Sequence, residues 1–146
     1  MNVVDCALKE VDFYCAPVEA TAHQILELLE LKEVELSILL CNNDFIQILN
    51  RDYRGKDYPT DVLSFSQRES ALDPMLGDVI ISVEKATTQA NEQDRALSDE
   101  LSLLLVHGVL HLLGYDHEED EEAEEMEAKE RAILSQLQVE WDAASR

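Results

Sequence analysis

Apolar and polar positions repeat with two different periods along the chain, and these periods predict strands and helices in mixed order. Alternation or short apolar runs predict strands at Val34–Ile38, Val62–Phe65 and Gly77–Val83, with a loop over Gln67–Leu76. Helical spacing predicts five helices: Thr21–Lys32, one that begins at Asn42 or Asn43, Glu84–Asp94, one from Ser98 to Gly114, and about Asp120–Leu137. With about four strands in all, we expect an α+β or α/β domain with one sheet.

The helix from Ser98 to Gly114 is apolar almost all round, which predicts that it is buried. We expect Ser98 to cap its first turn. Gly114 should end it, because glycine adopts the left-handed C-cap conformation without a Cβ penalty. The next helix differs in character, since Glu118–Glu130 holds nine acids in thirteen residues, a pattern typical of a solvated helix face.

The composition is that of an ordinary globular protein, whereas the charge is strongly acidic. The 146 residues fit one domain, spanning 1–146, and 46% of them are hydrophobic. Thirty-two acidic and eleven basic residues give a net charge of −21, which repels nucleic acids and anionic membranes. This balance excludes a nucleic-acid binder with a generally basic surface, but not a nucleic-acid enzyme with a local basic site.

Neither hydropathy nor cysteine content indicates a membrane or an oxidising compartment. No apolar run approaches the roughly 18 residues that span a bilayer, and residues 1–12 lack the apolar segment of a signal peptide. Cys6, Cys15 and Cys41 are an odd number without C-x-x-C spacing, which favours free thiols in a reducing cytosol. We therefore expect a cytoplasmic protein without a membrane partner.

Three of the four histidines fall within eleven residues, at positions 107, 111 and 117. His107 and His111 are four residues apart on a predicted helix and therefore share one face. Gly114 lets the chain reverse, so that His117 can return to the same point. Three imidazoles around an open fourth position are the pattern of a catalytic zinc site, which predicts one Zn²⁺ per chain. His23 stands alone on the first predicted helix and carries no such expectation.

The residue that follows His107 separates this segment from a known class of proteases. The spacing matches the metzincin pattern H-E-x-x-H-x-x-G-x-x-H, in which the Glu acts as general base. Gly108 occupies that position, so peptide hydrolysis by this route lacks its proton acceptor. A glycine inside a helix leaves two interpretations open: a large group such as a phosphate approaches the backbone there, or the helix packs closely on a neighbour.

A basic island lies in one part of this acidic chain. It consists of Arg51, Arg54, Lys56 and Arg68. Phosphate contact is one interpretation, since guanidinium groups suit phosphate; Arg51 and Arg54 also end a predicted helix, where cations are stabilised by the helix dipole. Asp116, beside His117, is a candidate either for orienting a ligand imidazole or for an Asx turn.

Three segments follow one another in the order of a known family. The histidine segment reads H-G-V-L-H-L-L-G-Y-D-H, Asn50–Asp57 with Thr60–Phe65 forms a basic loop and a strand, and Leu76–Ser82 forms the next strand. In these segments the chain resembles the YbeY family of ribosomal RNA maturation endoribonucleases, whose signature is H-G-x-L-H-L-x-G-Y-D-H. The resemblance spans residues 50–117, and the N-terminal third adds little to it.

The resemblance implies a fold, a site and a role. The fold is a single α+β domain in which a small mixed sheet of about four strands packs against about five helices. The site is a zinc ion held by His107, His111 and His117, with Arg54 at the position of the family's functional arginine. The role is single-strand-specific endoribonuclease activity in ribosomal RNA maturation and ribosome quality control. Partners in the family include ribosomal small-subunit components and an assembly GTPase.

We therefore expect metal-assisted phosphodiester hydrolysis, with Arg54 and the metal ligand His107 as catalytic residues. Arg54 would hold the phosphate and offset charge that develops in the transition state. Arg51, Lys56 and Arg68 would add substrate contacts. Two alternatives stay open: a metallopeptidase, which the spacing favours and Gly108 disfavours, and a non-catalytic assembly factor in which zinc only links the helix to its turn.

Overall fold

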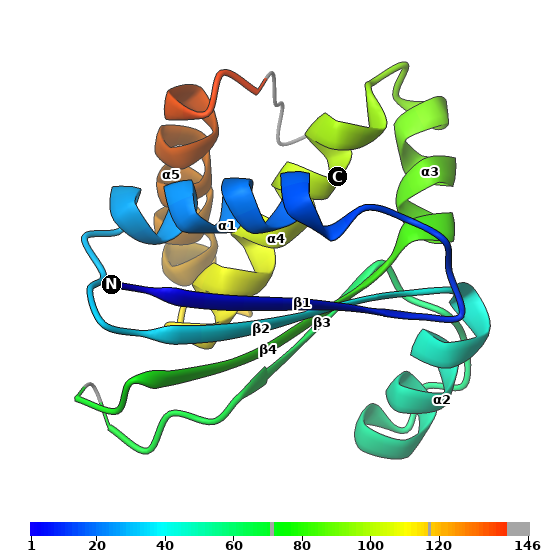
Figure 1. Cartoon of the computed structure of the whole chain (residues 1–146), viewed down its shortest axis with the longest axis horizontal. Coiled ribbons are helices and arrows are strands. Elements are labelled where there is room, and N and C mark those ends of the chain that lie inside the picture. The colour runs from blue at the N-terminus through cyan, green and yellow to red at the C-terminus, as the bar shows by residue number, and fades with distance from the viewer. Residues whose placement is uncertain (71, 117, 140–146) are drawn as a thin grey trace.

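One mixed sheet organises the molecule (Figure 1). The computed structural model describes residues 1–70, 72–116 and 118–139. The strands are β1 (Val3–Lys9), β2 (Glu35–Cys41), β3 (Val62–Ser66) and β4 (Met75–Ser82), in the spatial order β1-β2-β4-β3. β1, β2 and β4 run parallel, and β3 pairs antiparallel with β4 at the edge of the sheet. The α+β class with a small mixed sheet, as the sequence predicts, is confirmed.

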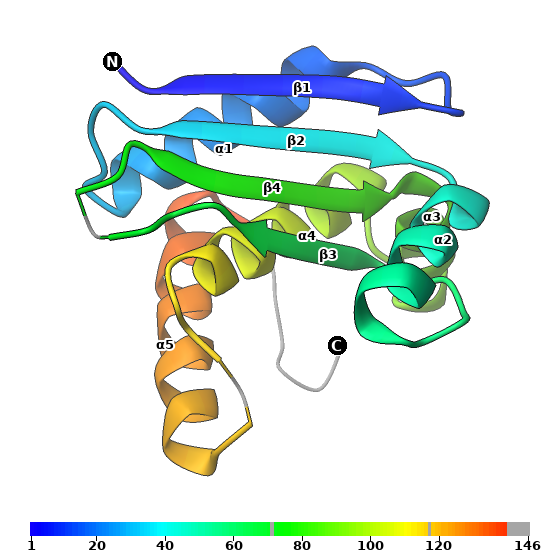
Figure 2. The ribbon, with the colours of Figure 1, turned by 90° about the horizontal axis from the view of Figure 1, so that it is seen from below.

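The helices of the described residues cover the two faces of the sheet unequally. One face carries four helices: α1 (Cys15–Leu28), α3 (Val83–Glu92), α4 (Leu97–Leu112) and α5 (Asp120–Gln136). The opposite face carries only α2 (Asn43–Arg54), which covers one end of it (Figure 2). The larger core lies under the four helices, and a smaller core under α2 contains Cys41, Ile46, Leu63 and Ile80. Much of the second face is therefore left open.

The helix α4 is buried along most of its length, as its apolar sequence predicts. Ten of its residues are buried, among them Leu103, Leu104 and Leu110 with no exposed surface. It ends at Leu112, and Gly114 follows with a φ of 97°, the left-handed region that the sequence assigned to this glycine. The position of α4 matters for function, because it carries both described histidines of the predicted zinc site.

The prediction that Ser98 caps α4 is wrong. The helix begins one residue earlier, at Leu97, and the carbonyl of Ala96 accepts the N–H groups of Asp99 and Glu100. Ser98 lies inside the first turn, where its own carbonyl accepts a hydrogen bond from the Ser102 hydroxyl at 3.0 Å. An ion pair stabilises the first turn instead of a cap. Arg95, just before the helix, places its Nη1 atom 2.9 Å from Glu100 Oε1, and both side chains are largely buried.

Gly108 lets α4 approach the sheet closely. A Cβ atom at this position would lie 2.7 Å from Val79 Cγ1 and 3.2 Å from Ser64 Oγ. The Ser64 hydroxyl of β3 also donates a hydrogen bond to the Gly108 carbonyl at 2.9 Å. Of the two interpretations that the sequence left open for this glycine, the structure supports close packing.

The N-terminal third departs most from the sequence prediction. β1 pairs along its whole length with β2, yet it was not among the predicted strands. It is an edge strand with only Val4 and Cys6 partly buried, so its alternation is weak. The helix α1 runs over Cys15–Leu28 and not over Thr21–Lys32. Its buried residues are Val18, Ala22, Ile25 and Leu26, whereas Leu28 is exposed.

Other element ends differ by one to three residues. Asn42 caps α2, because its side chain accepts the Phe45 N–H at 2.9 Å, so the predicted cap is confirmed. β4 begins at Met75, inside the segment predicted to be a loop, and Val83 opens α3 instead of ending β4. No helix among the described residues is both long and apolar enough to cross a membrane.

We predict that Gly108→Ala destabilises the fold by up to about 2 kcal/mol. Overpacking against Val79 costs about 1–3 kcal/mol, and the higher helix propensity of alanine returns about 1 kcal/mol. Denaturant unfolding measures the loss. The matched test adds Val79→Ala, which removes the clashing methyl groups, so the double variant should be more stable than the sum of the two single effects. Simple additivity would show that the contact at Gly108 is not tight.

Candidate functional site

Two imidazoles face each other on α4. The Nε2 atoms of His107 and His111 lie 2.9 Å apart, and the ring centroids 4.4 Å apart with an angle of 75° between the planes. This juxtaposition follows from their spacing, because residues four apart on a helix lie one above the other on one face. Two nitrogen ligands of one tetrahedral Zn²⁺ are about 3.3 Å apart, given Zn–N distances of about 2.0–2.1 Å. The pair therefore already has nearly the separation that a shared ion requires.

The other ring nitrogen of His107 is held by a buried carboxylate. Nδ1 of His107 donates to Glu130 Oε1 of α5 at 3.0 Å, and the Glu130 side chain is only 4% exposed. This bond keeps the ring proton on Nδ1, so the lone pair of Nε2 is directed at His111. A carboxylate on the far nitrogen is the usual way in which a metal-ligating histidine is oriented.

The role of Glu130 is missing from the sequence analysis, which assigned the whole acidic run to a solvated face. That assignment is wrong for this residue. Glu130 shares a face of α5 with Met126, Ile133 and Leu134, and all four side chains are buried. The signal was available in the sequence, since positions 126, 130, 133 and 134 have helical spacing. An acidic residue on the apolar stripe of a helix needs a polar partner, and His107 supplies one here.

The two histidines line a pocket of about 590 Å³. Its other walls come from β3 with the residues that precede it, from Arg54 and from the segment after α4. The full lining comprises Arg54, Thr60, Asp61, Val62, Leu63, Ser64, Phe65, Ser66, His107, His111, Leu112, Asp116 and Glu118. His117, the third predicted zinc ligand, lies outside the described residues, but both of its neighbours, Asp116 and Glu118, line the pocket.

Arg54 reaches this pocket because of how α2 ends. It is the last residue of the helix, and Gly55 follows in the left-handed region, with a φ of 71° and its N–H bonded to the Arg51 carbonyl. The buried Asn50 then fixes the returning loop, since its side-chain amide donates to the Tyr58 carbonyl at 2.9 Å. The turn brings the chain back into β3, so that Arg54 and β3 border the same pocket.

The structure divides the basic island. Arg54 lines the histidine pocket, whereas the other three residues are absent from its lining. Arg51 pairs with its neighbour Asp52, Nε to Oδ1 at 3.1 Å, and Arg68 donates to the Asp73 carbonyl at 3.3 Å. Lys56 is exposed in the loop after α2. A direct role at the pocket is thus supported for Arg54 alone among these four residues.

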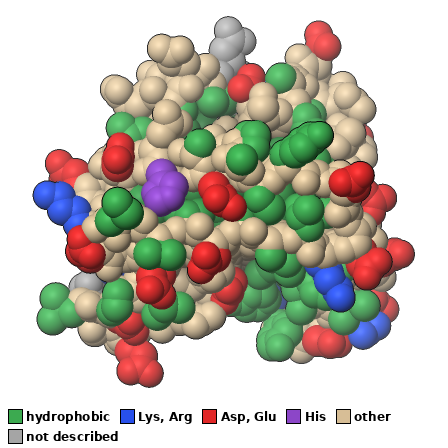
Figure 3. Space-filling model, in the orientation of Figure 1, with side chains coloured by type: hydrophobic (Ala, Val, Ile, Leu, Met, Phe, Trp, Pro, Cys, Tyr) green, Lys and Arg blue, Asp and Glu red, His purple; other side chains and the backbone are tan. Residues whose placement is uncertain are grey.

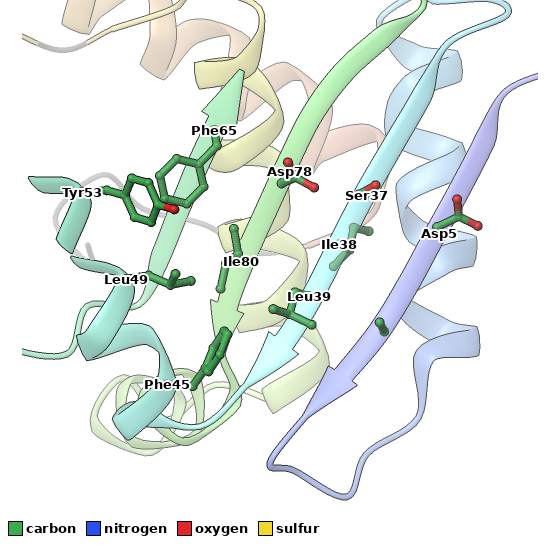
Figure 4. A pocket seen from close by; sticks show the side chains of 11 residues that line it. Asp5, Ser37, Ile38, Leu39, Phe45, Leu49, Tyr53, Phe65, Asp78 and Ile80 are labelled. Atoms are coloured by element: carbon green, nitrogen blue, oxygen red, sulfur yellow. The ribbon is translucent and has the colours of Figure 1, made fainter. Parts of the chain in front are cut away.

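The open face of the sheet carries a second pocket, of about 570 Å³, on the side of α2 (Figure 4). Its floor is formed by side chains of all four strands, with Asp5 and Asp78 among apolar neighbours. Tyr53 of α2 meets Phe65 of β3 edge to face, with ring centroids 5.2 Å apart. Phe65 lines both pockets, so β3 separates the histidine pocket from this groove.

The thiols have no close relation to the histidine pocket. The three cysteines are free, as the sequence predicts. Burial raises the pKa of Cys41 to about 12, and the nearby Glu84 adds to the effect. Burial also raises the pKa of Cys6 strongly, and the neighbouring Cys15 and Glu19 raise it further. None of the three residues lines the histidine pocket.

The surface is acidic, as the net charge requires. On the face seen in Figure 3, acidic side chains are spread widely, whereas Lys and Arg are few. Asp73 in the loop before β4 accepts the N–H groups of Met75 and Glu69, and these bonds lower the pKa of its carboxyl. Acidic side chains therefore dominate the charged surface seen in Figure 3, whereas Arg54 places a cation at the histidine pocket.

A partly buried histidine pair on a central helix, with a carboxylate behind it and an arginine lining the same pocket, is an arrangement typical of the active site of a small α+β hydrolase. Comparison with known proteins gives the family. The chain belongs to the endoribonuclease YbeY family, whose model matches residues 5–138. This confirms the resemblance seen in the sequence, and extends it over the N-terminal third.

Individual relatives give the same family. An endoribonuclease YbeY of Carboxydothermus hydrogenoformans is 54% identical over 105 residues, covering 72% of this chain and 73% of the relative. One from Geobacillus thermodenitrificans is 43% identical over 149 residues, covering 88% and 96%. The solution structure of TM1509 from Thermotoga maritima matches all of both chains with a TM-score of 0.61 at 26% identity.

We predict that Glu130→Ala lowers the free energy of unfolding by about 1–3 kcal/mol, because it removes the buried acceptor of the His107 Nδ1–H. Glu130→Gln is the matched variant, since its amide oxygen still accepts that hydrogen bond and its size is nearly unchanged. It should lose clearly less stability in the same denaturant titration. Equal losses for the two variants would show that the bond to His107 contributes nothing.

Proposed function

We propose that this chain is a zinc-dependent, single-strand-specific endoribonuclease that acts in ribosomal RNA maturation and ribosome quality control. The observation that carries the proposal is the pair of facing Nε2 atoms on α4, 2.9 Å apart, in a pocket that Arg54 also lines. Membership of the endoribonuclease YbeY family supports RNA as the substrate. The proposed reaction is hydrolysis of a phosphodiester bond.

The residues at the pocket fit a zinc ion. His107 and His111 present imidazole nitrogens to a common point, and the Glu130 carboxylate orients the ring of His107 through its other nitrogen. We assign His117 as the third ligand, which is supported by the lining positions of Asp116 and Glu118 on either side of it. A bound zinc ion supplies Lewis acidity toward a phosphoryl oxygen and makes a water molecule acidic enough to react near neutral pH.

Arg54 would bind the phosphate of the substrate. Its guanidinium group is a permanent cation in the lining of the histidine pocket, and a planar donor fork suits phosphate oxygens. Negative charge that develops on the phosphate during cleavage is then offset by a group already in position, which lowers the barrier. Arg51, Lys56 and Arg68 are proposed as outer contacts to neighbouring phosphates, because they lie away from the pocket lining. Asp116 is proposed to orient a ligand imidazole.

The structure weakens the metallopeptidase alternative. In that class the residue after the first histidine supplies the general base. Here the corresponding position is Gly108, where a Cβ would lie 2.7 Å from Val79 Cγ1, so no carboxylate side chain fits between α4 and the sheet. The histidine spacing still favours peptide cleavage, but the missing general base disfavours it.

The proposal extends to partners and location. An acidic chain of net charge −21 binds RNA weakly through a small local group of cations, so the ribosome or a protein partner must supply much of the targeting. Ribosomal small-subunit components and an assembly GTPase are the proposed partners, by analogy with the family, and the cytoplasm is the proposed location.

We predict that His111→Ala removes about one zinc ion per chain, because the remaining ligands hold an ion much less tightly. Elemental analysis of protein purified without chelator measures this loss. His23→Ala is the matched control, since His23 is an exposed histidine of α1, and it should keep the wild-type zinc content. Undiminished zinc in His111→Ala would contradict the assignment.

We predict that Arg54→Ala reduces cleavage of single-stranded RNA by about 10²–10³-fold, the usual loss when one preorganised donor to a developing charge is removed. Its zinc content and melting temperature should stay near those of the wild type, because Arg54 lies at an exposed helix end. Lys32→Ala removes the same charge at an exposed position outside the pocket and should cleave normally. If activity of Arg54→Ala simply follows the folded fraction, the arginine is structural.

A further inference from the structure

A second group of metal-ligating side chains joins β1 to α1. The two Sγ atoms of Cys6 and Cys15 and a carboxylate oxygen of Glu19 all lie within 4.8 Å of one another. Cys6 belongs to β1, whereas Cys15 and Glu19 belong to the first turns of α1. Figures 1 and 2 show α1 running beside β1 on the face of the sheet that carries four helices. None of the three residues lines the histidine pocket or the groove on the opposite face.

The local structure brings these three side chains together. Strand alternation turns Val4 and Cys6 toward the helices, whereas Asp5 and Ala7 line the groove on the opposite face. Cys15 and Glu19 are four residues apart on α1 and therefore share one face of the helix. The connection between the elements is only residues 10–14, and Glu10 with a φ of 61° helps to reverse the chain. The cluster is thus fixed by two elements on either side of a short loop.

We propose that Cys6, Cys15 and Glu19 form a binding site for a thiophilic divalent cation of the zinc type. This site is additional to the one proposed at the histidines, and it does not depend on the RNA activity. Two sulfur donors select zinc, cobalt or cadmium over magnesium and calcium, which prefer oxygen ligands. The carboxylate supplies the third donor, of a kind that zinc accepts together with sulfur.

The distances allow such a site with small adjustments. Two sulfur ligands of one tetrahedral zinc ion are about 3.8 Å apart, because Zn–S bonds are about 2.3 Å long. The present upper limit of 4.8 Å therefore requires a closure of at most about 1 Å, within the range of side-chain rotation. The thiols lose their protons when the ion binds, since a coordinating thiol is deprotonated outright.

The cluster is also accessible. All three residues are partly buried and none is fully enclosed, so an ion can enter without opening the core. Three protein donors leave a fourth position for water or a small anion. Burial on one side lowers the competition from water that a fully exposed cluster would meet. An ion here would link the edge strand β1 to α1, which are the first two elements of the chain.

The test is a titration of the reduced protein with Co²⁺ in the presence of a phosphine reductant. Cobalt bound to thiolates gives charge-transfer absorption in the near ultraviolet, whereas cobalt bound to histidines and carboxylates does not. We expect this absorption to saturate at one cobalt per chain, to disappear on addition of Zn²⁺, and to remain in His111→Ala. Absence of the absorption in protein whose thiols are shown to be reduced would overturn the proposal.

Variants assign the ligands. Cys6→Ser and Cys15→Ser should abolish the absorption, and Glu19→Gln should weaken cobalt binding by about tenfold or more, since even a partner that only orients a ligand contributes about 10–100-fold. Cys41→Ala is the matched control, because it removes the thiol that lies outside the cluster, and it should keep the full signal. A signal that survives Cys15→Ser, or that is lost in Cys41→Ala, would assign the metal to other residues.

A measurement on the wild-type protein tests the site without variants, which could lose the signal simply because they fail to fold. Zn²⁺ should protect Cys6 and Cys15 from alkylation, as seen by mass spectrometry of the peptides that contain them, under conditions where Mg²⁺ does not. Equal alkylation with and without Zn²⁺ would contradict the site. Formation of a Cys6–Cys15 disulfide on mild oxidation, combined with no protection by Zn²⁺ after reduction, would show that the pair is a redox pair instead.

Discussion

The close contact of α4 with β3 and β4 at Gly108 determines where the histidines lie. The helix backbone approaches the sheet so closely that a single methyl group would meet Val79 Cγ1 at 2.7 Å. At the same point the Ser64 hydroxyl donates to the Gly108 carbonyl. β3 therefore anchors the helix and also forms part of the pocket wall. Because His107 precedes the contact and His111 lies one turn beyond it, backbone packing sets the distance between the imidazoles and that wall.

The energetic cost of a carboxylate in the acidic run depends on which face of the helix carries it. The acidic run of residues 118–130 is mostly exposed, and a carboxylate there is solvated at little cost. Glu130 lies on the buried face of α5, where an unpaired carboxylate would be expensive, and the ring N–H of His107 offsets that cost. Arg54 is likewise distinguished by its place. It is a cation that borders the pocket at the end of α2, while most of the charged surface is acidic.

The features predicted from sequence are those that depend on local pattern. The apolar α4, the cap at Asn42, the left-handed Gly114 and the spacing of His107 and His111 each follow from residues within one or two turns. The features missed depend on distant partners. β1 is a strand because β2 pairs with it, although only Val4 and Cys6 of it are partly buried. Glu130 matters because α5 folds back onto α4. Ser98 is a local exception, since it fails as a cap because Leu97 already joins the helix.

The fold class could be predicted without these details, because it depends on the order of strands and helices along the chain and not on where each one begins or ends. The site was only half accessible. Sequence spacing places two imidazoles together, but it contains no information on which side chain lies behind them or which cation borders the pocket. By their local pattern Arg54 and Arg51 look alike, three residues apart at one helix end, and only the family resemblance singles out Arg54. In the structure only Arg54 lines the pocket, because the turn at Gly55 and the Asn50 bond to Tyr58 bring the chain back into β3 beside the last residue of α2.

The bond between His107 and Glu130 has a consequence for the order in which the protein matures during translation. Its two residues are 23 positions apart, and Glu130 lies in the last of the described helices. All four strands and α4 precede α5 in the chain, so they leave the ribosomal exit tunnel before it does. In that nascent state His107 is present but its ring is not yet held by the carboxylate. The ring of His107 is therefore held by the carboxylate only after α5 has emerged and docked on α4, so this bond forms later than the contacts among the preceding elements.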